Sequence, residues 1–335
     1  MKKLSLFALI LFFSCRVFAQ TVDYASHFNG IGDNREFFSN YNKPQTILGT
    51  RASFTLGGKI DSVHQVRVGI DYFYEYGSKF GELPPHLILY YQFLNSKWHF
   101  RMGTFARKEI MDLPLAIIAD DWDYFNPNLE GLFVGYRNNS INVNAYLDWI
   151  SRQSNTRREQ FMAGVNGDAH FKKITFSFNG YMFHNAKTAL WNENTFIEDY
   201  MGGLVLLGYD FSSILPLDVA YIKTGILNSL ARNRGDGMDF RVANSSYSQF
   251  QLEENGIGLR GTFNVGDKHS FYFGDSFYSN TTSYHRIDLY VTPLNFKNVK
   301  GRLGWSFHIA NGDLDNQQQF SLLYTFGGDL GKNNK

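Results

Sequence analysis

Residues 317–326, QQQFSLLYTF, form the last regular stretch of the chain and decide its fold class. Large apolar side chains at Phe320, Leu322, Tyr324 and Phe326 alternate there with smaller or polar ones. Strict alternation over this length predicts a β-strand with one apolar face, because successive side chains of a strand point to opposite sides. A short tail, residues 327–335, follows the closing aromatic residue.

The same two-residue period recurs upstream, and turn residues separate one run from the next. It is clearest in residues 65–76, where Val66, Val68 and Ile70 oppose Gln65 and Arg67. No run with helical spacing competes over a comparable length. The predicted strands are residues 22–28, 47–59, 65–76, 86–93, 97–105, 131–137, 141–150, 159–170, 174–183, 204–211, 217–224, 257–264, 270–277, 286–292, 299–309 and 317–326.

The lengths of the connections predict how these strands are joined. Short turns near residues 60, 95, 138, 172, 214, 266 and 296 alternate with longer connections, such as residues 106–130 and 225–256. Bacterial membrane barrels show this alternation, with short periplasmic turns, long extracellular loops and an even number of strands. We therefore expect an all-β fold, a transmembrane antiparallel up-and-down β-barrel of about 16 strands. The alternative is a soluble β-sandwich, whose strands alternate too.

Composition favours the membrane barrel over the sandwich. Aromatic residues make up 17% of the chain, with 32 Phe and 20 Tyr, although the mean hydropathy is polar. A membrane barrel needs such residues on its lipid-facing surface and in its interfacial girdles. The net charge of +1 argues against nucleic acid as a partner. After the N-terminal region, no segment approaches the ~18 consecutive apolar residues of a membrane helix.

The N-terminus predicts export. Lys2 and Lys3 precede an apolar run, residues 4–13, and Ala19 ends a cleavage-site pattern. We expect residues 1–19 to be a signal peptide and residues 20–335 to be the barrel. Cys15 could instead be a lipidated cysteine, although the residues around it match that motif poorly. Because Cys15 is the only cysteine, we expect no disulfide and no thiolate metal site.

Basic residues on the polar faces of the strands are candidates for the pore wall. An arginine on the lipid-facing side near the bilayer midplane would cost ~2–4 kcal/mol, so the alternation directs these side chains into the lumen. The alternative is that they pair with carboxylates on neighbouring strands and only stiffen the wall. The predicted pore-lining residues are Arg51, Arg67, Arg101, Arg137, Arg260, Arg286, Lys300 and Arg302.

The connection 106–130 has an unusual composition for a solvated loop. Its centre, residues 113–119 (LPLAIIA), is apolar, and acidic residues surround it. An apolar patch of this size usually has a partner, so we expect the loop to fold inward and narrow the pore. The alternative is that it packs against a neighbouring subunit. The acidic residues of this predicted constriction loop are Glu109, Asp112, Asp120, Asp121 and Asp123.

No catalytic or metal-binding motif stands out. Asn311, Asp313 and Asp315 lack the rest of a calcium loop. The residues His99, His170, His184, His285 and His308 show no metal-ligand spacing, and His184 has no serine beside it. We therefore expect no enzymatic activity, no cofactor and no metal.

Several short motifs resemble the porin-like outer-membrane barrels of Bacteroidota. They are residues 33–36 (DNRE), 45–49 (QTILG), 101–107 (RMGTFAR), 124–128 (YFNPN) and 130–131 (EG). The strand that ends at Phe326 also resembles the C-terminal strands of outer-membrane barrels. The resemblance implies a barrel in the bacterial outer membrane, surrounded by its lipid, and implies no particular substrate.

Two functions are consistent with these sequence features. The first is a channel for the passive passage of small hydrophilic solutes. Opposed basic and acidic groups would set its selectivity, with a modest preference for anions or hydroxyl-rich solutes. The second is a plugged structural barrel, acting as a subunit of an outer-membrane assembly. The candidate protein partners are further copies of this chain, in a homo-oligomer, or another outer-membrane protein.

Overall fold

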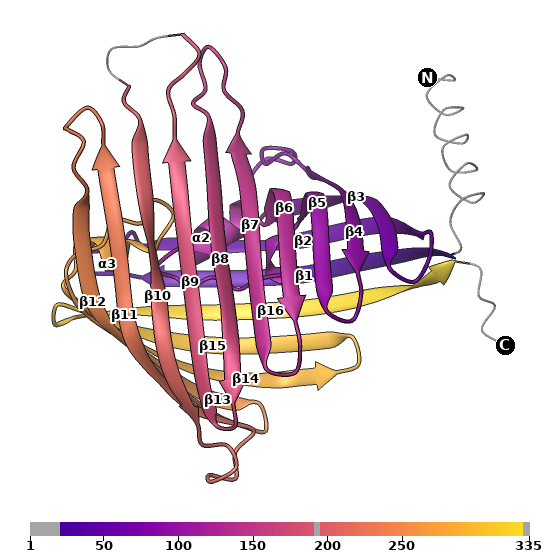
Figure 1. The fold of residues 1–335 in the computed structure, drawn as a ribbon. Helices are drawn as coiled ribbons and strands as arrows, with labels where there is room; N and C mark the ends of the chain where they lie inside the picture. Colours follow the sequence, from indigo (N-terminus) through magenta and orange to yellow (C-terminus); the bar gives the residue numbers. More distant parts are fainter. Residues whose placement is uncertain (1–20, 191–194, 331–335) are drawn as a thin grey trace.

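The structure, a computed structural model, describes residues 21–190 and 195–330 and is a closed antiparallel barrel in which each strand pairs with the next (Figure 1). The strands are β1 (Thr21–Glu36), β2 (Gln45–Lys59), β3 (His64–Glu75), β4 (His86–Leu94), β5 (Trp98–Ala106), β6 (Asn128–Arg137), β7 (Ile141–Ser151), β8 (Gln160–Phe171), β9 (Ile174–Asn185), β10 (Glu198–Asp210), β11 (Val219–Asn233), β12 (Arg241–Glu254), β13 (Ile257–Gly266), β14 (Ser283–Phe296), β15 (Val299–Ala310) and β16 (Asp313–Leu330). The expected fold class, an up-and-down barrel of 16 strands, is confirmed.

The alternation of side chains sets the two faces of the wall. On β3, Val66, Val68 and Ile70 are exposed on the outer face, whereas Gln65 and Asp71 are buried on the inner face. Exposed apolar groups on the outside of a barrel are the surface that lipid covers. Each strand has at least 9 residues, enough to cross the hydrocarbon layer when tilted.

The barrel closes between its first and last strands. β1 and β16 pair from Val22 opposite Leu330 to Glu36 opposite Asn316. Both strands are longer than expected. The predicted first strand ended at Phe28 and the predicted last strand ended at Phe326, whereas β1 continues to Glu36 and β16 to Leu330. The first part of the expected tail, residues 327–330, therefore belongs to the wall.

One predicted strand was wrong and one strand was missed, although the count was right. The region 225–256, expected to be a loop, contains the end of β11 and all of β12. Residues 270–277, expected to be a strand, belong instead to a loop and the start of α3 (Ser276–Asn280). The turn that was missed is Asn255–Gly256, where both residues have positive φ, 50° and 77°. Asn-Gly is the preferred pair for such a hairpin turn.

Short turns lie at one end of the barrel and long connections at the other, as in bacterial outer-membrane proteins. The long connections therefore mark the extracellular end. The predicted signal peptide, with Cys15, lies outside the described residues. In the part of the chain that is described, no helix is both long enough and apolar enough to cross a bilayer.

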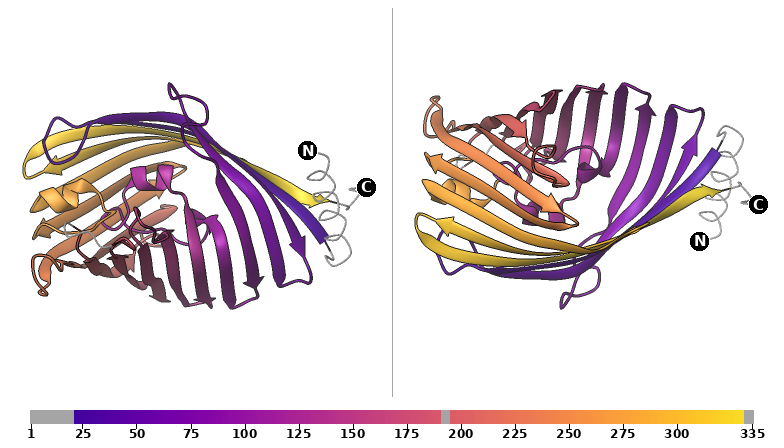
Figure 2. Two further views of the ribbon diagram at one scale, coloured as in Figure 1. Left: turned by 90° about the horizontal axis from the view of Figure 1, so that it is seen from above. Right: turned by 90° about the horizontal axis from the view of Figure 1, so that it is seen from below.

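Two extracellular connections fold back into the barrel. Residues 107–127 contain η1 (Arg107–Glu109) and α2 (Asp120–Phe125), and α2 lies inside the ring of strands (Figure 2). Residues 267–282 contain α3. The two loops join through backbone hydrogen bonds from Ala119 to the Phe273 carbonyl and from Asp275 to the Leu115 carbonyl. Gly274 permits this approach, because a Cβ there would lie 2.0 Å from the Ala116 carbonyl oxygen.

Candidate functional site

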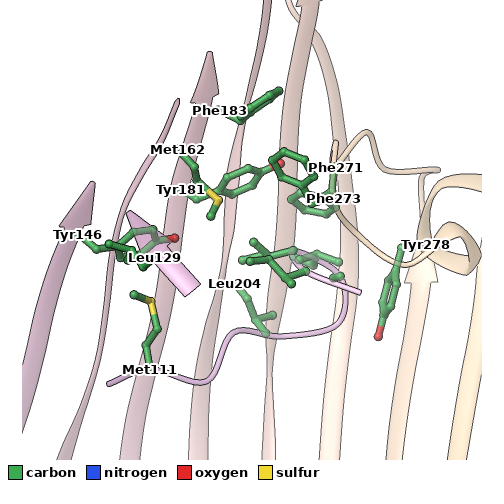
Figure 3. Packing of buried hydrophobic residues seen from close by; sticks show 14 of the residues in the cluster. Met111, Leu129, Tyr146, Met162, Tyr181, Phe183, Leu204, Phe271, Phe273 and Tyr278 are labelled. Carbon is green, nitrogen blue, oxygen red and sulfur yellow. The ribbon is translucent and has the colours of Figure 1, made fainter. Parts of the chain in front are cut away.

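An apolar cluster, which we call the plug, fills the extracellular half of the lumen. Ala116, Ile117 and Ile118 at the centre of the loop 107–127 are almost fully buried, with exposures of 0%, 1% and 3%. They belong to one cluster with Phe271 and Phe273 of the second infolded loop. The wall contributes Leu129, Tyr146, Met162, Tyr181, Phe183 and Leu204 (Figure 3).

The plug explains the apolar composition of residues 113–119, whose side chains turn away from water. The lumen is therefore partly apolar, since Met162, Phe183 and Leu204 point inward from the wall. Removing such side chains from water is worth about 1.5–3 kcal/mol each. The two loops are thus held in the barrel mainly by apolar packing.

Below the plug lies a polar cavity of about 640 Å³, which we call the arginine cavity. Arg51, Arg67 and Arg101 line it, and each is paired. Arg51 lies 3.5 Å from Asp71 and donates to the Tyr124 carbonyl. Arg67 binds Asp23, and the Arg101 guanidinium lies 2.7 Å from the Glu109 carboxylate.

The other predicted pore-lining residues are spread over different parts of the wall. Arg260 and Arg286 both bind Asp288, at 2.9 Å and 2.6 Å. Arg302 stacks over the Tyr290 ring, 4.4 Å from its centroid. Arg137 and Lys300 lie at the periplasmic ends of β6 and β15. The basic residues therefore do not form one continuous arc.

The acidic residues of the loop 107–127 are likewise dispersed. Glu109 and Asp123 line the arginine cavity, whereas Asp120 lines a cavity of about 360 Å³ near Asp288. Asp121 lies 3.8 Å from Arg35. Asp112 lines a third cavity, on the wall formed by β7 to β9. The loop does fold inward, but its carboxylates do not face the arginines as a single opposed ring.

A different group of charged residues lies on the outer face, at the extracellular rim. We call His184, Asp199, Arg232 and Arg234 the rim cluster. Asp199 accepts a hydrogen bond from His184 Nδ1 at 2.8 Å and one from Arg232 Nε at 2.7 Å. Arg234 Nε donates to the same carboxylate at 3.1 Å. His184 alternates with the inward-facing Phe183 and Asn185, so it faces outward.

The geometry of the rim cluster leaves one imidazole nitrogen available. The Asp199 carboxylate is 8% exposed, and it holds the imidazole through Nδ1. Among the described residues, Nε2 of His184 has no hydrogen-bond partner, and the side chain is 22% exposed. A histidine oriented in this way by a carboxylate can accept a proton at its free nitrogen.

Aromatic rings continue the rim cluster along the outer wall. The Phe161 ring lies 5.3 Å from the His184 ring, and Trp149 stacks on Phe161 at 5.5 Å. The Arg232 guanidinium covers the Phe240 ring at 4.4 Å. Aromatic and basic side chains at this height match the interface between lipid headgroups and acyl chains. His184 was not predicted as a site residue, because it lacks a serine neighbour in the sequence. The signal that could have identified it is the pairing of outward positions across β9, β10 and β11.

His269, His308 and His170 are less suited to chemistry on a lipid. His269 is 1% exposed, and it lies between the Ser229 and Ser245 hydroxyls, where burial lowers its pKa to about 4. His308 is also 1% exposed and contacts Tyr284. His170 contacts Asp168 and Thr175, but it faces the lumen at the periplasmic end.

No group of three or more His, Cys, Asp or Glu side chains has a metal-binding arrangement in the described part of the chain. Asp315, one of the acidic residues noted in the sequence, has structural contacts instead. Asp315 accepts hydrogen bonds from the backbone of Phe38 and Ser39.

A family model described as "Lipid A 3'-O-deacylase-type" matches residues 22–330. Among curated proteins, none matches the sequence significantly. Solved structures of similar fold include the outer-membrane protein opdK from Pseudomonas aeruginosa, with 11% identity, a TM-score of 0.52, and coverage of 93% of this chain and 100% of that one. OmpF from Salmonella typhi, in complex with daunomycin, has 10% identity, a TM-score of 0.52, and coverage of 91% and 97%.

These findings confirm the expected location and correct one expectation. The barrel fold and the family place the protein in the outer membrane. At these identities, the porins show the shared fold alone. The expectation of no enzymatic activity is wrong, because the matching family is named for an enzyme.

Proposed function

Because the chain belongs to the lipid A 3'-O-deacylase-type family, we propose that it hydrolyses an ester-linked acyl chain of an outer-leaflet lipid at the rim cluster. The observation that carries this proposal is the contact of His184 with Asp199 on the outer wall. A lipid in the bilayer can reach this face without entering the barrel. The buried histidines and the lumenal His170 lack that access.

The residues of the rim cluster have complementary roles in the proposed reaction. Asp199 holds His184 with Nδ1 protonated, so that Nε2 takes a proton from a water molecule. The water oxygen adds to the ester carbonyl, and the C–O bond to the sugar then breaks. His184 returns the proton to the leaving alkoxide, and the products are a free fatty acid and a hydroxyl group.

Arg234 is the basic residue best placed to attract an anionic lipid. Its side chain is 34% exposed, whereas that of Arg232 is 18% exposed beside the Phe240 ring. Arginine binds phosphate through paired N–H donors. Trp149 and Phe161 supply an apolar surface for acyl chains next to the imidazole. These contacts suit a phosphorylated lipid such as lipid A.

The test compares acyl release by purified variants in vesicles that contain lipid A. His184→Gln should lower the rate about 100-fold or more, the usual contribution of a general base. Asp199→Asn should lower it less, since the imidazole remains. His170→Gln, which changes the lumenal histidine beside Asp168, is the matched control and should keep the wild-type rate. A His184→Gln protein as active as the wild type would disprove the assignment.

The polar cavities favour a second candidate, passage of small hydrophilic solutes. The arginine cavity is lined by arginines and carboxylates in similar number, with Gln65 and Gln92 between them. Because positive and negative groups are balanced, such a wall suits polar, hydroxyl-rich solutes and should discriminate little between anions and cations. Single-channel conductance of the purified protein tests this candidate, and the absence of discrete conductance steps would exclude it.

A further inference from the structure

The outer wall carries a polar patch at the depth where lipid chains are expected. On β11 and β12 the outward positions include Thr224, Asn228, Asn244, Ser246 and Ser248. We call these five residues the polar patch. They face outward because the intervening residues Leu227, Ser245 and Tyr247 are buried on the inside.

The polar patch lies near the middle of the membrane-spanning band. On β11 it is bounded by Ile222 on the periplasmic side and Arg232 on the extracellular side. At the usual rise and tilt, the stretch between those two residues covers about 25 Å, the height of the apolar band of a barrel. Thr224 and Asn228 fall inside that band, so lipid chains would otherwise cover them.

Within the described part of the chain, the hydrogen bonds of the patch do not use all of its donors and acceptors. Asn228 donates to the Asn244 side-chain oxygen at 2.7 Å, and the Thr224 and Ser248 hydroxyls are 2.9 Å apart. An amide or hydroxyl offers more donors and acceptors than one such bond uses. In hydrocarbon, a polar group without a hydrogen-bond partner is strongly unfavourable. Other outer faces differ: the outward positions Val205 and Leu207 on the adjoining β10 are apolar, and so are Val68 and Leu89 on the more distant β3 and β4.

We infer that the polar patch is the contact surface of a dimer formed by two copies of this chain. Two copies in one membrane are related by an axis along the membrane normal, so each residue meets its counterpart at the same depth. The Asn228–Asn244 pair of one copy then lies opposite the same pair of the other copy, and the Thr224–Ser248 pairs lie opposite each other in the same way. Amides and hydroxyls both donate and accept, which makes the patch complementary to itself. Two-fold contacts of this kind are the commonest in oligomers.

The exposed apolar residues around the patch fit the same contact. Ile226, 61% exposed, lies between Thr224 and Asn228 on β11, and Val242, 56% exposed, lies beyond Asn244 on β12. The side chains of Ser246 and Ser248 are small, so they project little from the outer wall. Small and polar residues together allow close approach of two membrane-spanning surfaces.

Crosslinking in intact outer membranes tests the inference. In a Cys15→Ser background, Ser246→Cys should give a disulfide-linked dimer under mild oxidation. Val68→Cys, on the outward face of β3, is the matched control and should remain monomeric. Equal crosslinking at both positions, or none at Ser246→Cys, would overturn the dimer.

A second measurement does not depend on cysteine chemistry. Native mass spectrometry in mild detergent should find the wild type as a dimer. It should find the Asn228→Leu/Asn244→Leu/Ser246→Leu variant as a monomer. A mobility change on boiling would show that the variant is folded. A monomeric wild type, or a variant that stays dimeric, would contradict the inference.

Discussion

At the scale of single residues, Arg101 shows how one side chain links the wall to the infolded loop. Its guanidinium binds Glu109 of η1, the Gln92 side chain on β4, and the face of the Tyr90 ring at 4.9 Å. Arg67 instead binds within the wall, to Asp23 and Thr55. Pairing of this kind stiffens the barrel, yet both residues still line the arginine cavity.

If solutes pass through the arginine cavity, Arg67→Glu combined with Arg101→Glu should shift selectivity toward cations. The reason is that the cavity loses two positive charges and gains two negative ones beside Asp23 and Glu109. Reversal potentials in a salt gradient measure the shift. Unchanged selectivity would mean that these arginines only brace the wall.

At the scale of elements, the two infolded loops act as one unit. The plug holds the loop 107–127 against the loop 267–282, and Asp275 caps α3 by accepting a hydrogen bond from the Phe277 backbone at 2.9 Å. Asp275 also accepts one from Asn42 at 3.0 Å. Despite these bonds, loss of water around its carboxyl raises the pKa of Asp275 to about 6.

This raised pKa predicts how the stability of the loop unit depends on pH. A carboxyl whose folded-state pKa lies above its unfolded value favours the folded state when protonated. The loop unit should therefore be most stable below about pH 4 and weaken as the pH rises through 6, by at most about 3 kcal/mol. Asp275→Asn should remove this dependence. Hydrogen exchange of residues 267–282 at pH 5 and pH 7.5 measures it. Equal pH dependence in both proteins would show that Asp275 is not the responsible group.

Deletion of residues 112–123 tests the role of the plug in conduction. It removes Ile117, Ile118 and most of α2, so it should raise single-channel conductance if solutes pass through the lumen. Deletion of residues 77–82, an extracellular connection, is the control and should have no comparable effect. Equal conductance after both deletions would mean that the plug does not limit flow.

The strand predictions were accurate for some elements and failed for others. Alternation located β3 and β7 well, because their outward positions are apolar without interruption. It failed at β12, whose outward positions include Asn244, Ser246 and Ser248, so no apolar period exists there. In contrast, residues 270–277 alternate because Phe271 and Phe273 are buried in the plug. Apolar residues at every second position indicate that one side of the segment is buried. They do not distinguish a strand of the barrel wall from a loop packed inside that wall.

The candidate site was harder to predict than the fold, for a related reason. His184, Asp199 and Arg232 come from three strands, and their meeting depends on cross-strand register. Register across long extracellular connections is not visible in a single sequence. The infolding of residues 106–130 was foreseen from its apolar centre, whereas the dispersal of its carboxylates over four cavities was not.

At the scale of the whole molecule, closure depends on the long pairing of β1 with β16. Removing residues 327–335 would leave Val22 to Ala25 without partners on that side. An open edge exposes unpaired backbone groups to lipid, which is unfavourable. The truncated barrel should therefore unfold at a lower temperature than the wild type. Unfolding is measured as the change in gel mobility after heating. An unchanged transition temperature would show that the last pairs do not stabilise the closure.

The whole molecule combines a lumen partly occupied by the plug with an outer wall that carries charged groups at the extracellular rim. Its surface toward lipid, rather than its interior, is therefore the proposed place of reaction. The most direct test is the number of acyl chains on lipid A from cells that make equal amounts of folded protein. Wild type should yield lipid A with one chain fewer, and His184→Gln should leave it intact, as measured by mass spectrometry. Identical lipid A from both strains would contradict the proposed reaction at the rim cluster.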